Sequence, residues 1–109
     1  MSINTVISEA LSPLGLPVAF NVYQGAEKRH IVFNYFTTPD DFGDDAPGCE
    51  IYHVQVHFYG PYGSNDAAYF RGIKKNLHDA GFTWPEMQDV SDRDGNHFVF
   101  ECQYSDEVG

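Results

Sequence analysis

The fold is decided by the stretch EIYHVQVHFY, residues 50–59, in which two sets of side chains alternate. Period-two alternation over this length predicts a β-strand with one face in the core, and we expect this strand to be the central one of the sheet. The core-facing set is apolar or aromatic: Tyr52, Val54, Val56 and Phe58. The opposite set is a candidate contact surface for a partner or a second copy of the chain: His53, Gln55, His57 and Tyr59.

Helical patterns lie on both sides of this strand. Apolar residues recur at helical spacing near the N-terminus and predict a helix over about residues 3–12. A second helix is predicted over about residues 64–80, with Ser64 or Asn65 as its cap and Gly81 just beyond its end. We expect both helices to cover the same face of the sheet.

Four further segments predict strands. Val18–Tyr23 and His30–Phe36 are rich in β-branched and aromatic residues and are joined by a polar, Gly-containing segment, which predicts a hairpin. Residues 82–90 predict a weak edge strand interrupted by a proline. Residues 98–104 predict a strand with its even-numbered positions inward, followed by a frayed acidic end. The whole chain is therefore predicted to be one α+β domain, 1–109, with about five mostly antiparallel strands in the order α-β-β-β-α-β-β.

The segment Thr37–Gly48, TTPDDFGDDAPG, predicts neither helix nor strand. Clustered carboxylates suit Ca²⁺, but the EF-hand spacing with its distal Glu is missing. We interpret the segment as a long loop that contacts a partner. Its candidate contact residues are the four aspartates Asp40, Asp41, Asp44 and Asp45.

The pair His53-x-x-x-His57 is not expected to bind a metal. On a strand the two residues lie about 13 Å apart, at roughly 3.3 Å per residue, and one ion cannot bridge two imidazoles at that separation. Paired histidines across a subunit contact would instead respond to pH. No metal ligand set and no cofactor is predicted.

The charge balance is strongly acidic, with 6 Lys+Arg against 16 Asp+Glu and a formal net charge of −10. This charge disfavours nucleic-acid clamps and anionic membrane surfaces and favours a basic partner. The two cysteines, Cys49 and Cys102, indicate free thiols in a reducing compartment. The first residues lack the pattern of a signal peptide, and no stretch of 18 apolar residues occurs, so we expect a soluble protein made in the cytoplasm.

Catalytic motifs are missing from the sequence. It contains no GxSxG nucleophile elbow and no Gly-rich phosphate loop of either common type. A Cys102–His97 pair is excluded by parity, because odd and even positions of a strand face opposite ways. The sequence therefore predicts that the protein is not an enzyme.

Several segments, taken in order, resemble a known family. They are VYQG at 22–25, IVFNY at 31–35, the Asp-rich loop with Asp44 and Asp45, VQVHFY at 54–59, the helix with IKKNL at 73–77 that runs into AGF at 80–82, and HFVFEC at 97–102. Over roughly residues 20–104 the chain is similar to the small tail terminator or tail completion proteins of long-tailed bacteriophages and prophages of Gram-positive hosts.

The resemblance implies an α+β protomer that forms a ring, commonly a hexamer. Such a ring caps the finished tail tube, ends its elongation and joins the tail to the head. The implied partners are further copies of the chain, the tail tube protein and the head completion protein, while DNA passes through without specific binding. The implied location is the virion neck, after assembly in the host cytoplasm.

Alternative functions remain open. One is a small acidic adaptor domain that binds a basic phage or host protein, and another is a different neck or minor virion protein. A third is a small metal-dependent enzyme that uses the Asp-rich loop. Stoichiometric binding by a monomer would favour the adaptor, and tight uptake of divalent ions would favour the enzyme.

Overall fold

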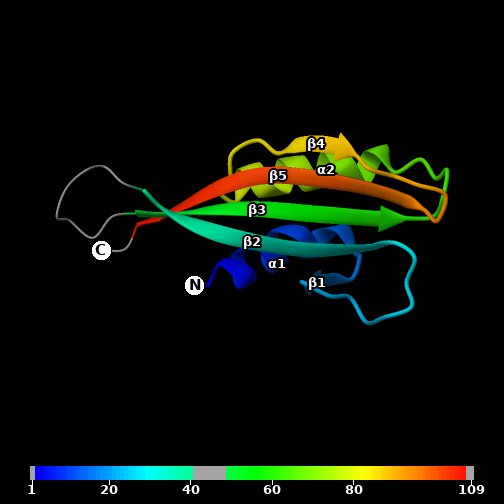
Figure 1. Ribbon diagram of the computed structural model, residues 1–109, viewed down its shortest axis with the longest axis horizontal. Coiled ribbons are helices and arrows are strands. Elements are labelled where there is room, and N and C mark those ends of the chain that lie inside the picture. Colours follow the sequence, from blue (N-terminus) through cyan, green and yellow to red (C-terminus); the bar gives the residue numbers. More distant parts are fainter. Residues whose placement is uncertain (1, 41–48, 108–109) are drawn as a thin grey trace.

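A computed structural model describes residues 2–40 and 49–107 of the chain (Figure 1). The elements follow one another in the predicted order α-β-β-β-α-β-β, with one short 3₁₀ helix, η1, after the first α-helix. Their bounds are α1 Ile3–Leu11, η1 Ser12–Leu14, β1 Val18–Phe20, β2 His30–Asp40, β3 Cys49–Gly60, α2 Ala67–Asp79, β4 Glu86–Asp89 and β5 Asn96–Glu107. The predicted α+β class is confirmed.

The five strands form one sheet in the order β1-β2-β3-β5-β4. Strand β3 is central, as the alternation of residues 50–59 predicts, and it pairs antiparallel with β2 on one side and with β5 on the other. Strand β4 pairs antiparallel with β5 and forms an edge, again as predicted. Figure 1 looks onto the sheet from one side, and both helices lie behind it.

The predicted hairpin between the first two strands is wrong. Strand β1 is shorter than expected and runs parallel to β2, with Val18 beside Ile31 and Phe20 beside Phe33. Asn21 turns the chain with a φ of 66°, and its N–H donates to the carbonyl of Phe33 at 2.9 Å. The polar segment that was expected to form a tight turn instead carries the chain back to the start of β2. Side-chain alternation fixes which face is buried, but it does not encode strand direction.

Two long strands extend further than the sequence predicts. Thr37–Asp40 belongs to β2, and residues 105–107, expected to fray, belong to β5. Both pair with β3, and Pro39 lies opposite Glu50. The backbone polar groups of Ile31 and Phe33 point away from β3, toward β1, and Pro39 shares their parity. Proline is tolerated there because, in the described part of the sheet, β1 reaches only to Phe33 and no strand pairs with that side of β2 at Pro39. This three-stranded end of the sheet projects beyond the helices (Figure 1).

The second helix begins later than predicted. Asp66 occupies the N-cap position, but its side chain makes no capping hydrogen bond. Its carboxylate instead accepts from the Arg29 Nε at 2.9 Å and from the Ser64 hydroxyl at 2.5 Å. The predicted end is confirmed, since Gly81 has a φ of 105° just beyond the helix.

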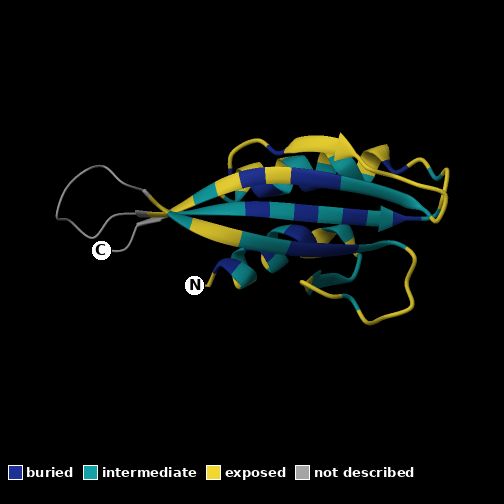
Figure 2. Cartoon of the chain, in the orientation of Figure 1, coloured by how far each residue is buried: buried dark blue, intermediate teal, exposed yellow. Residues whose placement is uncertain are grey.

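One layer of core lies between the sheet and the two helices. The apolar set of β3 faces this layer as predicted, with Val54, Val56 and Phe58 buried and Tyr52 half-buried (Figure 2). The helices contribute one stripe each, and β2 and β5 contribute their inward positions. The other buried members of the core are Ile3, Ile7, Leu11, Ile31, Phe33, Ile73, Leu77, Phe82, Phe100 and Cys102.

Candidate interaction surface

The face of β2, β3 and β5 opposite the helices is the candidate site, and we call it the outer face. Within the described ranges, no helix or strand packs on it, and Figure 1 looks directly onto it. Over the middle of these strands, its residues follow from the registers: His30, Val32, Asn34, Phe36 and Thr38 of β2, Ile51, His53, Gln55, His57 and Tyr59 of β3, and His97, Val99, Glu101 and Gln103 of β5. The predicted contact residues of β3 all belong to it.

Formal charge is scarce on the outer face. Charged residues make up 20% of the chain, and the net charge is −10. Of the outer-face residues just named, Glu101 is the only one that carries a formal charge at neutral pH. Two valines, Val32 and Val99, are buried on it among their strand neighbours although no further layer covers them. Depletion of charge with aromatic enrichment is typical of the centre of a protein–protein interface.

Histidines are concentrated on this face, which carries four of the five in the chain. Two of these histidines, His30 and His97, lie in one stack of rings with Tyr59 and Tyr23. At one end of the stack, the ring centroid of Tyr23 lies 4.3 Å from that of His30. The stack continues from His30 to Tyr59 at 4.9 Å and from Tyr59 to His97 at 4.3 Å, with interplanar angles of 17° and 22°. The outer face is thus a nearly continuous aromatic surface at this end.

His57 and His97 contact each other directly. The His57 Nδ1 and the His97 Nε2 lie 2.9 Å apart, on the neighbouring strands β3 and β5. Burial lowers the pKa of His57, and the adjacent His97 lowers it further. Burial also lowers the pKa of His97, while the carboxylate of Asp92 acts in the opposite direction. The sequence did not reveal this contact, because it depends on the register between two strands far apart in the chain.

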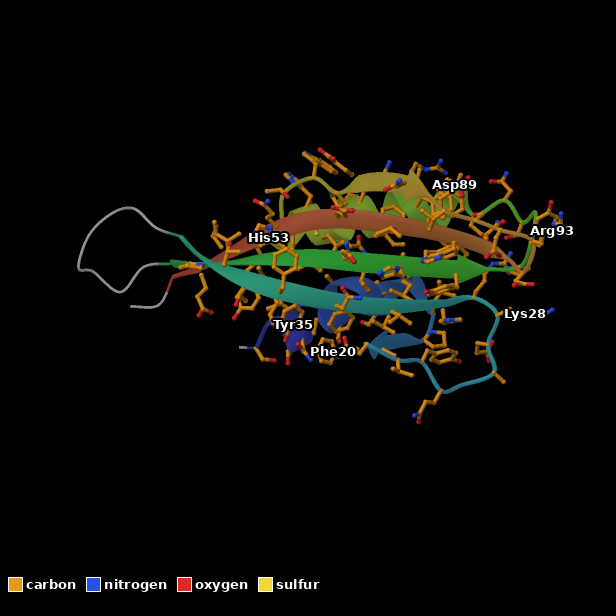
Figure 3. The ribbon with its side chains drawn as sticks, viewed as in Figure 1. Phe20, Lys28, Tyr35, His53, Asp89 and Arg93 are labelled. Carbon is orange, nitrogen blue, oxygen red and sulfur yellow. The ribbon has the colours of Figure 1, made fainter. Side chains whose placement is uncertain are left out.

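His53 has partners of its own. Its ring stacks on Phe36 at 4.6 Å, its Nε2 lies 2.8 Å from the Thr38 hydroxyl, and its Nδ1 lies 3.4 Å from the Gln103 amide (Figure 3). His53 and His57 therefore bind different neighbours, consistent with their positions on a strand. Across residues 2–40 and 49–107, no group of three or more His, Cys, Asp or Glu side chains is placed to hold a metal ion.

Each end of the outer face is hollowed. A pocket of about 630 Å³ lies at the end of the aromatic stack, where Tyr59 and His97 meet Tyr62 and the turn that carries Asp92. A smaller pocket of about 240 Å³ lies toward the other end, where His53 is one of its lining residues. The face therefore offers relief into which side chains of a partner can insert.

The predicted acidic contact residues are only partly described. Asp41, Asp44 and Asp45 lie outside the described residues. For Asp40 the structure gives the backbone, which pairs with Cys49 in the β2–β3 ladder. Their proposed role as a contact remains a prediction from the sequence.

Cys102 lies on the core side of β5 and His97 on the outer face, as the parity argument predicts. Burial raises the pKa of the Cys102 thiol to about 12. At pH 8 only about one thiol in 10⁴ is then ionised, so the residue lacks the thiolate that nucleophilic chemistry requires.

We therefore expect Cys102 to resist alkylation by iodoacetamide at pH 8 in the folded protein and to react fully in guanidinium chloride. Peptide mass mapping separates it from Cys49 and so reads out each thiol independently. Labelling of Cys102 at equal rates in the native and the unfolded chain would contradict the burial described.

Comparison with known proteins gives the fold and little else. No protein-family model matches the chain, and no curated protein matches it. A solved structure of a protein whose name states no function is similar, with a TM-score of 0.58 and 13% sequence identity over 98% of this chain and 94% of the other. At that identity the likeness shows a shared fold alone. In the described residues, no helix is both long and apolar enough to cross a membrane.

Proposed function

We propose that this chain is a structural protein of a tailed bacteriophage, whose copies form a ring that caps the tail tube, ends tail elongation and joins the tail to the head. The proposal draws its class from the resemblance of residues 20–104 to tail terminator and tail completion proteins. The single structural observation that supports it is the uncovered, low-charge outer face of the sheet.

The outer face differs in charge from the chain as a whole. The chain has a net charge of −10, yet over the middle of β2, β3 and β5 this face carries one formally charged residue, Glu101, among aromatic rings, histidines and two buried valines. A sheet face exposed only to water would gain solubility from charge, whereas a face that becomes covered loses free energy for each charge it buries. The distribution favours a protein that works by contact with other subunits.

The acidic charge fits a ring through which DNA passes. A negative lumen repels the phosphate backbone and lets DNA move without adhering. The same charge opposes the approach of identical copies at low salt. We therefore propose that the end of the tail tube serves as a template that promotes ring formation, and a monomer in dilute solution is compatible with the proposal.

Deletion of the gene from its phage genome tests the function. We expect DNA-filled heads and separate tails of abnormal length, with no joined particles, in electron micrographs of the lysate. Complementation with the wild-type gene should restore infectious virions. Normal virions from the deletion would refute the assignment.

A matched pair of variants then tests the role of the outer face. Gln55→Lys places a charge at the centre of this face, and Gln24→Lys makes the same change at an exposed position outside the sheet. We expect Gln24→Lys to complement the deletion and Gln55→Lys to lower the titre of infectious virions at least tenfold. Circular dichroism should show that both variant proteins are folded. Equal titres would remove the outer face from the proposal.

A further inference from the structure

The contact between His57 and His97 has a geometry that suits a shared proton. The two residues are diagonal neighbours, since His57 lies opposite Val99 and His97 lies opposite Tyr59. Their facing nitrogens are 2.9 Å apart and their ring centroids 5.1 Å. The centroid separation nearly equals the N···N distance plus two ring radii, so the rings meet nearly end to end. The facing lone pairs then lie along one line, as in an N–H···N hydrogen bond, rather than converging on a metal beside it.

This geometry limits how many protons the pair can hold. Two neutral imidazoles carry one N–H each, and one of these forms the hydrogen bond. A first added proton can enter at an outward nitrogen, which leaves the bond intact and makes it charge-assisted. A second added proton puts an N–H on both facing nitrogens, so the bond is lost and two positive charges face each other. The pair must therefore take up its two protons in two separated steps.

Charged and polar groups around the pair decide which of the two histidines takes up the first proton. Asp92 lies close enough to raise the proton affinity of His97, and the Asn34 amide lies 3.5 Å from the His57 Nε2. Asp94 and Lys28 line the pocket beside His97 with opposite charges. Glu101 lies two residues beyond Val99 on β5, and Glu86 of β4 lies opposite Glu101. Because Asp92 favours the protonated form of His97, we expect the first proton to reside mainly on His97.

The second step acts on the aromatic stack. Tyr59 lies between His30 and His97, with centroid separations of 4.9 and 4.3 Å. If repulsion drives His97 away from His57, Tyr59 loses one of the two rings on which it stacks, and the wall of the larger pocket changes with it. A local charge event is in this way converted into a change in the shape of the outer face.

We propose that His57 and His97 form a proton-operated switch on the outer face: with no more than one added proton the aromatic stack stays closed, and the second proton separates the imidazoles and opens it. The switch is a property of the single chain and holds whether or not the chain forms a phage ring. For a partner seated on the outer face, it means contact at neutral pH and release in acid.

The test is an NMR titration of the full, isotopically labelled chain from pH 8 to pH 4.5, following the histidine and tyrosine rings. We expect His57 and His97 to share two steps whose proton affinities differ at least tenfold, and the Tyr59 ring to shift with the lower step only. His78, which stacks on Trp84 and has no contact with His57 or His97 among those described, provides the position for a control variant. Independent single steps for His57 and His97, or a Tyr59 ring that does not respond to the lower step, would overturn the proposal.

Variants separate the switch from general acid unfolding. His97→Gln keeps a hydrogen-bonding side chain but cannot be protonated, so His57 should titrate in one step and the acid-dependent shift of Tyr59 should disappear. His78→Gln should leave both steps of the pair unchanged. Core methyl resonances, such as those of Ile7 and Val54, report whether each variant stays folded, and His57→Gln replaces His97→Gln if the latter does not. Persistence of the Tyr59 transition in the folded Gln variant would show that the pair does not cause it.

Discussion

Replacing Val56 by Asp is expected to lower the free energy of unfolding by about 3–5 kcal/mol, enough to unfold much of the protein at 37 °C. Val56 is fully buried at the centre of β3, the central strand, and its side chain faces the helix layer. Within the apolar core that surrounds it, a carboxylate would lose its hydration without gaining a charged partner. Urea denaturation followed by circular dichroism measures the loss.

The matched control is Gln55→Asp, one residue earlier on the same strand. Its side chain is partly exposed on the outer face, so the new carboxylate keeps contact with water, and the penalties are repulsion from Glu101 on the neighbouring strand and the low strand propensity of Asp. We expect a loss below about 1 kcal/mol for this variant. If Val56→Asp melts within a few degrees of the wild type, the assignment of the inward face is wrong.

The alternation of residues 50–59 was sufficient to predict the central strand and its two faces. Period two fixes the inward and outward sets once a single face is buried, and the four predicted inward residues, Tyr52, Val54, Val56 and Phe58, pack in or against the core. Helical spacing predicted both helices in the same way. The fold class therefore follows from local pattern, because burial imposes one periodicity on each element.

Features that depend on pairing between distant segments could not be predicted. The direction of β1, the contact of His57 with His97, and the ion pair of Arg29 with Asp66 all join residues whose proximity is set by register and topology. The paired end of β2 was missed for a related reason. Proline and aspartate disfavour strands, but a ladder to β3 on one side overrides that preference.

The ion pair between Arg29 and Asp66 fixes the start of β2 to the start of α2. The Arg29 Nε donates to the Asp66 Oδ1 at 2.9 Å, the Asp66 side chain is 1% exposed, and that of Arg29 is 39% exposed. Ser64 donates to the second carboxylate oxygen, and the Asn96 amide donates to the Ser64 carbonyl at 2.9 Å. The carboxylate thus depends on one charged partner to offset its loss of hydration.

Replacing Arg29 by Met is therefore expected to cost about 2–4 kcal/mol, because it leaves a buried carboxylate without its cation while keeping much of the packing of the stem. The control variant Lys75→Met breaks the other ion pair in the described part of the chain, between Lys75 and Asp79. The side chains of these two residues are 72% and 56% exposed, so we expect this variant to cost less than about 0.5 kcal/mol. The double variant Arg29→Met/Asp66→Asn decides whether the penalty comes from the unpaired charge. We expect it to be less destabilised than the sum of its single variants by at least about 1 kcal/mol in urea denaturation. Additive losses would show that Asp66 is stabilised by its polar neighbours alone and that Arg29 acts only through its packing.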